Sequence, residues 1–247
     1  MIDIKQAYHG IRLEESSRQY TCFTTFKGNY EFNSCVFGML NSQAALCRTM
    51  SKVLAGVLGK NIHIYIDDLI IHSTTVEHHL DLLKEVIEQL DKANLSVNPA
   101  KCKMFQTGIK YLGMFVDQLG VHCVEEQIDS ILNLKRSENT KSVRQFLGAV
   151  NFYSSHIPYY SELAKPLYAL CSKTKVFEWN ESHEKAWVSL KGRLVDTPIL
   201  AFPDFEKEFE LMTDASDTAI AGVLGQKQEG KRVAIAFISK ALNAAQA

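Results

Sequence analysis

The chain has 247 residues, of which 46% are hydrophobic and 22% charged, a composition typical of one or two globular domains with a sizeable core. The net charge of −1 divides as 0, +1 and −2 over residues 1–117, 118–178 and 179–247, which excludes a strongly basic nucleic-acid-binding protein. The six cysteines are scattered without a Cys-x-x-Cys pair, which indicates free thiols in a reducing compartment and argues against a zinc site. No run approaches the roughly 20 apolar residues of a membrane span, and the start of the chain has no apolar targeting segment.

The N-terminal part predicts a strand end, a hairpin and a helix. Met1–Ile4 predicts the end of a strand that carries a carboxylate, and Lys5–Arg12 predicts a helical turn, so we expect further elements of the domain to precede them. Gln19–Phe32 alternates apolar and polar residues and breaks at Lys27-Gly28-Asn29, which indicates a hairpin. After Asn41 the apolar residues recur at helical spacing as far as residue 58.

The segment Asn61–Ser73, NIHIYIDDLIIHS, places two adjacent carboxylates, Asp67 and Asp68, between two isoleucine-rich runs. Such β-branched runs around a very short polar link predict a hairpin with the acidic pair at or beside its turn. A plain turn is the alternative, because aspartate is a common turn residue. Seven of the ten residues from Ile62 to Ile71 are Ile, Leu or Tyr, so the carboxylates should lie at the edge of a core. Their mutual repulsion there favours a bound hard divalent cation.

The next segment predicts the clearest helix of the chain. Thr74-Thr75-Val76-Glu77 fits a capping box. Apolar residues then recur at three- and four-residue steps, which predicts a buried stripe of Val76, Leu80, Leu83, Ile87 and Leu90. Asn98-Pro99 ends this segment. Farther on, Ile109–Val116 predicts a strand, residues 117–120 a turn, and Val121–Val124 the returning strand.

From Glu125 the sequence predicts short helices, at Gln127–Leu134 and at Ser142–Tyr153, the second with Ser142-x-x-Gln145 as a capping box. Four aromatic and four basic residues are interleaved here: Phe152, Tyr153, Tyr159, Tyr160, Lys135, Arg136, Lys141 and Arg144. Phosphate contacts combined with base stacking would make this group a nucleic-acid-binding face. The alternative is that the aromatic residues form the core of a small helical subdomain.

The last part predicts a helix at Ser182–Leu194 and, after a proline-containing linker, three successive strands. These strands are expected at Glu208–Thr213, Ala219–Gln226 and Val233–Ser239, with Asp214 at the end of the first. They indicate the start of an α/β domain, and a covering helix should follow near Ala247.

Four stretches together carry a family resemblance: IDIKQAYHGIRL, CVFGMLNSQ, the YIDD of the acidic hairpin, and FEWNESHEKAWVSLKGRLVDTPILAFPDF with the following LMTDASDTAIAGVLGQ. The chain resembles, over nearly its whole length, the reverse transcriptase part of the Pol polyprotein of Gypsy-type long-terminal-repeat retrotransposons. This resemblance implies an α+β fold with a right-hand polymerase palm, a helical thumb or connection, and an incomplete ribonuclease H-like α/β domain. The implied boundaries are palm 1–117, thumb or connection 118–178, and connection helix with truncated ribonuclease H-like domain 179–247.

The resemblance implies RNA-directed DNA synthesis at a primer, by two-metal phosphoryl transfer with two Mg²⁺ ions on Asp3, Asp67 and Asp68. Tyr8 matches the aromatic residue under the incoming sugar, with a core tyrosine as the alternative, and Tyr65, Phe37 and Gly38 match the nucleotide and template pocket. Lys135, Arg136, Lys141, Arg144 and Tyr153 would belong to the nucleic-acid-binding thumb. Asp214 matches the first metal-binding carboxylate of ribonuclease H, whose remaining carboxylates are expected beyond residue 247. The implied partners are an RNA or DNA template with its primer and deoxynucleoside triphosphates, in the cytoplasm or in virus-like particles of the element, with no membrane.

Three departures count against a working enzyme. The first favours a rival function, a non-catalytic remnant that keeps the fold and binds nucleic acid or protein, whereas the three aspartates and Tyr8 disfavour it. The fingers expected before Asp3 are almost wholly absent. Asn41-Ser42-Gln43 stands where the family usually has Asn-Ala-Pro, and the region around Ser154-Ser155-His156 is less basic than usual. A metal-dependent nuclease centred on Asp214 is a third, weaker alternative.

Overall fold

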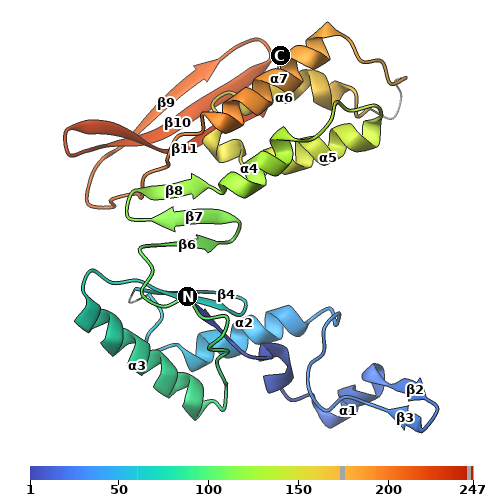
Figure 1. Ribbon diagram of the computed structural model, residues 1–247, viewed down its shortest axis with the longest axis vertical. Helices are drawn as coiled ribbons and strands as arrows, with labels where there is room; N and C mark the ends of the chain where they lie inside the picture. Colours follow the sequence, from blue (N-terminus) through green and yellow to red (C-terminus); the bar gives the residue numbers. More distant parts are fainter. Residues whose placement is uncertain (60, 173–175, 244–245, 247) are drawn as a thin grey trace. The chain divides into compact units, whose positions relative to one another are not determined.

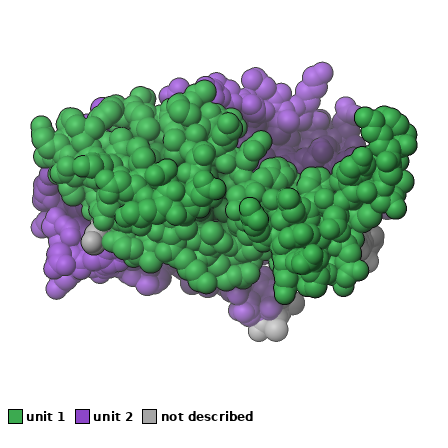
Figure 2. All heavy atoms as spheres, turned by 90° about the horizontal axis from the view of Figure 1, so that it is seen from below, with its two compact units in different colours: residues 1–106 green, residues 107–247 purple. Residues whose placement is uncertain are grey.

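The computed structural model describes residues 1–59, 61–172, 176–243 and 246, in two compact units that comprise residues 1–106 and 107–247 (Figures 1 and 2). Both units combine helices with antiparallel strands, which confirms the predicted α+β class. No helix in the described part of the chain has both the length and the apolar character needed to cross a bilayer.

Unit 1 is built on a three-stranded antiparallel sheet in the order β1-β5-β4. Its elements are β1 (Ile2–Asp3), η1 (Ala7–Gly10), α1 (Glu15–Arg18), η2 (Gln19–Thr21), β2 (Phe23–Thr25), β3 (Gly28–Tyr30), α2 (Ser42–Val53), β4 (Ile62–Tyr65), β5 (Asp68–Ile71) and α3 (Val76–Lys92). The predicted strand end, both hairpins and both helices are therefore confirmed. Helices α2 and α3 pack on the sheet through a core that includes Leu46, Met50, Leu69, Val86 and Leu90.

The buried face of α3 differs from the predicted one. Leu82, Val86 and Leu90 are buried at four-residue steps, whereas Val76, Leu80 and Ile87 are 58%, 49% and 44% exposed. Both faces of this helix carry apolar residues, so spacing alone did not identify the one that meets the sheet.

Two helix starts are also corrected. Thr75, not Thr74, caps α3, and its Oγ1 accepts the His78 N–H at 3.2 Å. Helix α5 begins at Thr140, where Asn139 Oδ1 accepts the Ser142 N–H at 2.9 Å. Ser142 is thus the third residue of the helix, at the end of this capping box, and not the cap, because Asn139 caps the helix three residues earlier.

Unit 2 contains two three-stranded antiparallel sheets, ordered β6-β7-β8 and β11-β10-β9, and a group of helices. Its elements are β6 (Gly108–Tyr111), β7 (Met114–Asp117), β8 (Gly120–Cys123), α4 (Glu125–Leu132), α5 (Thr140–Asn151), η3 (Ser154–His156), α6 (Tyr160–Ala169), α7 (Glu181–Val195), β9 (Phe209–Ala215), β10 (Ala219–Gln228) and β11 (Lys231–Ala241). The three predicted C-terminal strands are confirmed. Residues 109–116, predicted as one strand, are a hairpin, because the chain turns at Leu112 and Gly113 with φ of 50° and 79°.

The helices of unit 2 share one core. Phe146 of α5 is fully buried and stacks on Trp187 of α7, with ring centroids 3.8 Å apart. Helix α6 contacts the C-terminal sheet along β11 (Figure 1), where Ser161 N–H donates to Ser239 Oγ and Ser161 Oγ donates to the Ser239 carbonyl, both at 2.8 Å. Helices and C-terminal sheet therefore form one unit.

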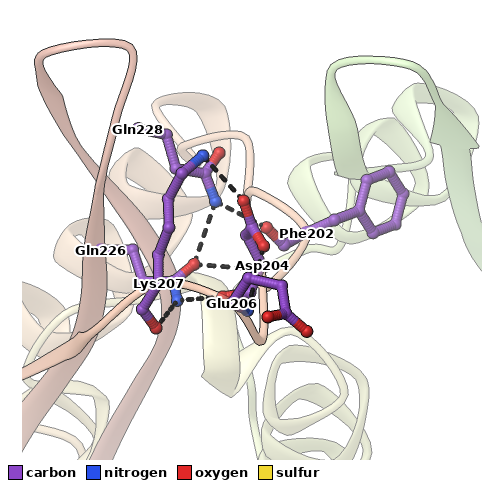
Figure 3. Close-up of polar contacts among 6 residues, drawn as sticks. All are labelled: Phe202, Asp204, Glu206, Lys207, Gln226 and Gln228. Atoms are coloured by element: carbon purple, nitrogen blue, oxygen red, sulfur yellow. Dashed lines mark hydrogen bonds and ion pairs between the residues drawn. The ribbon is translucent and has the colours of Figure 1, made fainter.

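A buried glutamine, Gln226 of the central strand β10, binds the linker before β9 to the C-terminal sheet by hydrogen bonds (Figure 3). Gln226 is 1% exposed, and its Oε1 accepts the Asp204 N–H at 2.9 Å. Its Nε2 donates to the carbonyls of Asp204 and Lys207 at 2.7 and 3.1 Å. The side chains of Asp204 and Lys207 pair at 2.7 Å, and Gln228 Nε2 donates to the Phe202 carbonyl at 2.8 Å. One side chain thus satisfies three polar groups of the linker.

We expect Gln226→Ala to lower the free energy of unfolding of unit 2 by about 1–3 kcal/mol, because it removes three part-buried hydrogen bonds to the linker backbone. Both tryptophans, Trp179 and Trp187, lie in unit 2, so urea unfolding followed by tryptophan fluorescence reports this unit. The matched control is Lys227→Ala, at the exposed next position of the same strand. Equal unfolding midpoints for the two variants would contradict the predicted role.

Candidate functional site

The acidic hairpin of unit 1 has the predicted form. Strands β4 and β5 pair from Ile62↔Ile71 to Tyr65↔Asp68, which leaves Ile66 and Asp67 as the two-residue turn. Ile66 adopts a φ of 60°, a left-handed conformation that a β-branched residue rarely takes and that costs about 1–3 kcal/mol. Its side chain packs against the core of unit 1, which compensates for this strain.

The third aspartate lies on the neighbouring strand. Strand β1 pairs with β5 so that Asp3 is directly opposite Asp68, and Ile2 is opposite Leu69. Side chains at directly opposed positions of antiparallel strands have Cβ atoms about 4.5–5.5 Å apart. The register therefore brings Asp3 beside Asp68, across 65 positions of sequence, with Asp67 adjacent in the turn.

The electrostatic surroundings of Asp68 agree with this register. Burial raises the pKa of Asp68, and the nearby Asp67 and Asp3 carboxylates raise it further. Ionisation of Asp68 consequently destabilises the folded state in the absence of a cation. The contribution of Asp68 to the free energy of unfolding therefore decreases with rising pH. The decrease begins at about pH 3.9, the ordinary pKa of aspartate, and ends above the raised pKa of Asp68 in the folded protein.

We expect Asp68→Asn to stabilise the hairpin at pH 7 by about 0.2–1 kcal/mol, the usual cost of like charges at opposed strand positions. Hydrogen exchange of the β4–β5 amides measures this locally. The gain should disappear at pH 3, where the parental carboxyl is protonated, and added Mg²⁺ should stabilise the parent but not the variant. Asp81→Asn on α3, an exposed carboxylate, is the control. An unchanged exchange rate in Asp68→Asn would contradict the inferred repulsion.

The fit of these residues to metal ions is partial. Three carboxylates supply the hard oxygen ligands that Mg²⁺ prefers, and their repulsion is what a cation would relieve. Within the described residues, however, no group of three or more His, Cys, Asp or Glu side chains has an arrangement that holds a metal ion. The structure thus gathers Asp3, Asp67 and Asp68 without closing them into a coordination shell.

Two of the residues predicted to contact nucleotide, Tyr8 and Phe37, come together from distant segments. Tyr8 and Phe37 have ring centroids 5.1 Å apart, and the His9 ring packs on Phe37 in a T-shaped arrangement with centroids 5.8 Å apart. Phe37 is 74% exposed, while Tyr8 is half-buried and touches the core of unit 1. Gly38 has a φ of +88° with open space around it, and Tyr65, opposite Asp68, is 50% exposed.

The predicted basic and aromatic group separates into two kinds of residue. Tyr153 is 2% exposed and donates to Gln127 Oε1 at 2.5 Å, so its ring belongs to the helical core and offers no face to a base. The four cations are exposed. Arg144 donates to the Cys171 carbonyl at 2.7 Å, and Arg136 lies 5.3 Å from the ring centre of Trp179. Lys135 and Lys141 have neither kind of contact among the described residues.

Asp214 lies on β9 opposite Ala221 of β10, in the second unit. It lines a small hollow of about 20 Å³ together with Tyr159, Glu162 and Ser216. Sequence reasoning missed Glu162, because nothing near this helical glutamate indicates that α6 packs beside β9 and β10. Its carboxylate is the acidic side chain that the structure adds to the surroundings of Asp214.

Comparison with known proteins identifies both parts of the chain. Residues 1–116 match the family model for reverse transcriptase (RNA-dependent DNA polymerase), and residues 179–247 match the model for the RNase H-like domain found in reverse transcriptase. The Tf2-3 transposon polyprotein of Schizosaccharomyces pombe is 33% identical over 246 residues, which are 99% of this chain and 18% of the relative. The Pol polyprotein of transposon 297 of Drosophila melanogaster is 35% identical over 243 residues, 98% of this chain and 23% of the relative.

Solved structures show the same fold. A foamy viral protease-reverse transcriptase in complex with an RNA/DNA hybrid superposes with a TM-score of 0.86 and 25% identity, over 99% of this chain and 33% of that one. The same type of protein in complex with dsDNA gives a TM-score of 0.89 and 25% identity, over 99% and 51%. The chain spans less than a quarter of the length of the two retrotransposon relatives. The chain therefore belongs to the reverse transcriptases of Gypsy-type long-terminal-repeat retrotransposon Pol polyproteins, and carries their RNase H-like domain over residues 179–247.

Proposed function

We propose that this chain contributes the catalytic palm of an RNA-directed DNA polymerase that adds deoxynucleotides to a primer. The observation that carries the proposal is the convergence of Asp3, Asp67 and Asp68 from two neighbouring strands and their turn. The proposed division is palm over residues 1–117, thumb or connection over 118–178, and the RNase H-like part after that. The proposed setting is the cytoplasm or the element's virus-like particles.

The three aspartates would hold two Mg²⁺ ions. When bound, such ions lower the pKa of the primer 3′-hydroxyl and stabilise the charge on the departing pyrophosphate. The residues of the chain hold the three carboxylates in position. The strand register holds Asp3 against Asp68, and the core contact of Ile66 fixes the turn that presents Asp67. The pair of Tyr8 and Phe37 would lie beside the sugar and base of the incoming nucleotide and exclude a 2′-hydroxyl.

Primer extension tests this proposal. The purified chain is incubated with a DNA primer on an RNA template, deoxynucleotides and Mg²⁺, beside a longer chain that restores the upstream fingers segment of a related polyprotein. Extension by either protein supports the polymerase. Extension by the longer protein alone would show that the palm is competent when an upstream segment accompanies it. No extension by either would overturn the proposal.

A second candidate is nucleic-acid binding without catalysis. Two observations favour it. Among the described residues, Asp3, Asp67 and Asp68 do not form a complete metal coordination shell, and the cations around α5 are exposed. The two solved relatives above were seen with an RNA/DNA hybrid and with dsDNA. For this chain we propose that Lys135 and Lys141 contact phosphates of a template–primer duplex. Arg136 and Arg144 would assist them, while Tyr153 supports the face from within the core.

We expect Lys141→Ala to weaken binding to an RNA/DNA hybrid similarly for all sequences, and to reduce the slope of log affinity against log salt by about 1, because one phosphate contact releases about one counterion. Fluorescence anisotropy at several salt concentrations measures this slope. Lys185→Ala is the matched control, because Lys185 is paired with Glu181 at 2.7 Å on α7. The same slope for Lys141→Ala and the parent would contradict the proposed contact.

A further inference from the structure

Two histidines face each other at the open end of the acidic hairpin. His63 lies in β4 and His72 directly follows β5. Their Nε2 atoms are 3.2 Å apart, and the ring planes are 7° from parallel with centroids separated by 5.2 Å. The short nitrogen distance relative to the centroid distance means that the two nitrogens point toward each other. Both side chains are exposed, so an ion can reach them from solvent.

The strand register holds this pair in place. Ile62 pairs with Ile71, and the His72 N–H donates to the Asn61 carbonyl at 3.0 Å, which continues the ladder past the last strand residue. His63 and His72 are thus diagonal neighbours on one face of the hairpin, a separation that ring side chains bridge. An ion placed between the two Nε2 atoms could therefore bind both rings with little movement of either.

Two imidazolium ions cannot remain at this distance without strong repulsion. Although its side chain is largely exposed, partial desolvation on the protein side lowers the pKa of His72, and the neighbouring His63 lowers it further. The lowered pKa favours the unprotonated ring of His72, the form in which histidine binds metal. Two nitrogens bound to one zinc ion at about 2.0–2.1 Å in tetrahedral geometry lie roughly 3.3–3.4 Å apart, close to the separation observed.

A further histidine near the pair, His79, is engaged elsewhere. His79 Nδ1 is 3.0 Å from Ser73 Oγ, and its ring packs on Phe105 with centroids 5.3 Å apart. No third His, Cys, Asp or Glu of the described part completes a three-ligand group. A metal at the pair would therefore have two protein ligands and water in its other positions.

We propose that His63 and His72 form a two-imidazole site for a divalent transition-metal ion of the zinc class, at the opposite end of the hairpin from Asp67 and Asp68. The scattered cysteines argue against a thiolate zinc site, but an imidazole pair binds zinc without cysteine ligands. Nitrogen ligands select zinc, copper or nickel over magnesium, so this site differs in chemistry from the carboxylates. The bound ion would tie β4 to β5 and stabilise the hairpin by mass action.

Zinc titration of the chain labelled with ¹⁵N at histidine tests the site. The titration is done in excess Mg²⁺, which occupies the carboxylates. The ¹⁵N signals of the two rings report zinc bound at these imidazoles and do not respond to zinc bound at free thiols. We expect the Nε2 resonances of His63 and His72 to shift together at one equivalent of Zn²⁺. No shift of either ring in a large excess of Zn²⁺ would show that the pair only shares a proton, and would overturn the proposal.

Single substitutions show whether the two rings act together. His63→Ala should weaken Zn²⁺ binding at His72 by roughly 100-fold, because the chelate is lost. His72→Ala should weaken Zn²⁺ binding at His63 to the same extent. His78, an exposed histidine on α3, is the control, and His78→Ala should leave the Zn²⁺ affinity of the pair unchanged. His63→Gln, which keeps a polar side chain, repeats the test if the alanine variant alters the amide spectrum of the hairpin. Full Zn²⁺ affinity at His72 in both His63 variants would overturn the proposal.

Discussion

Asp67→Asn should reduce the rate of primer extension by about 1000-fold, equivalent to about 4 kcal/mol of transition-state stabilisation. Asparagine keeps the size of the side chain and its ability to accept a hydrogen bond, but it removes the negative charge that a metal ion requires. Because Asp67 lies in the turn and its carboxylate already repels Asp68, the fold should tolerate this change. The loss should therefore appear in activity and not in stability.

Single-nucleotide incorporation in a rapid-quench experiment measures this rate, in whichever form of the protein extends the primer. Asp81→Asn removes an equivalent charge from the exposed side of α3 and should leave the rate unchanged. Raising the Mg²⁺ concentration should recover part of the Asp67→Asn activity if the defect is weaker metal binding. An Asp67→Asn protein that extends the primer at the parental rate would remove the basis of the polymerase proposal.

Phe146→Ala should cost unit 2 about 3–5 kcal/mol of its free energy of unfolding, the usual effect of deleting a buried aromatic ring. The ring is completely buried and stacks on Trp187 at 3.8 Å, so its removal leaves a cavity between α5 and α7. The loss should be seen as a large fall in the urea midpoint. Tryptophan fluorescence follows it directly, because Trp187 lines the cavity.

The matched control for this variant is Phe205→Ala, since Phe205 lies in the same unit with 82% of its surface exposed. Its midpoint should stay close to that of the parent. Similar midpoints for the two alanine variants would mean that the contact between α5 and α7 contributes little to stability, contrary to the packing described above.

The acidic hairpin could be predicted from sequence because the strand signals on both sides of the aspartates agreed, although a β-branched isoleucine is unusual in the left-handed turn position that Ile66 takes. Isoleucine-rich runs on both sides of two aspartates specify strands and turn together, and the structure places the turn at Ile66 and Asp67. The partnership of Asp3 with Asp68 was implied only by the family resemblance. Strand pairing between residues so distant in sequence is decided by tertiary packing, which local patterns do not contain.

Other features needed the structure because competing residues carried similar signals. Helix α3 has apolar residues on two faces, and only the sheet decides that Val86 is buried while Ile87 is exposed. Tyr153 lies among cations in the sequence, yet its ring fills the helical core. The histidine pair gave no sequence signal either, because His63 and His72 become neighbours only when the strands take their register.

The left-handed turn residue has a consequence for how activity should depend on temperature. Ile66 holds its unfavourable backbone conformation only while its side chain packs against the core of unit 1. The position of Asp67 is therefore coupled to the cooperative melting of that core, because a loosened core would let the turn relax to an ordinary conformation. Loss of activity on heating should coincide with the unfolding of unit 1, without an earlier local transition at the acidic turn.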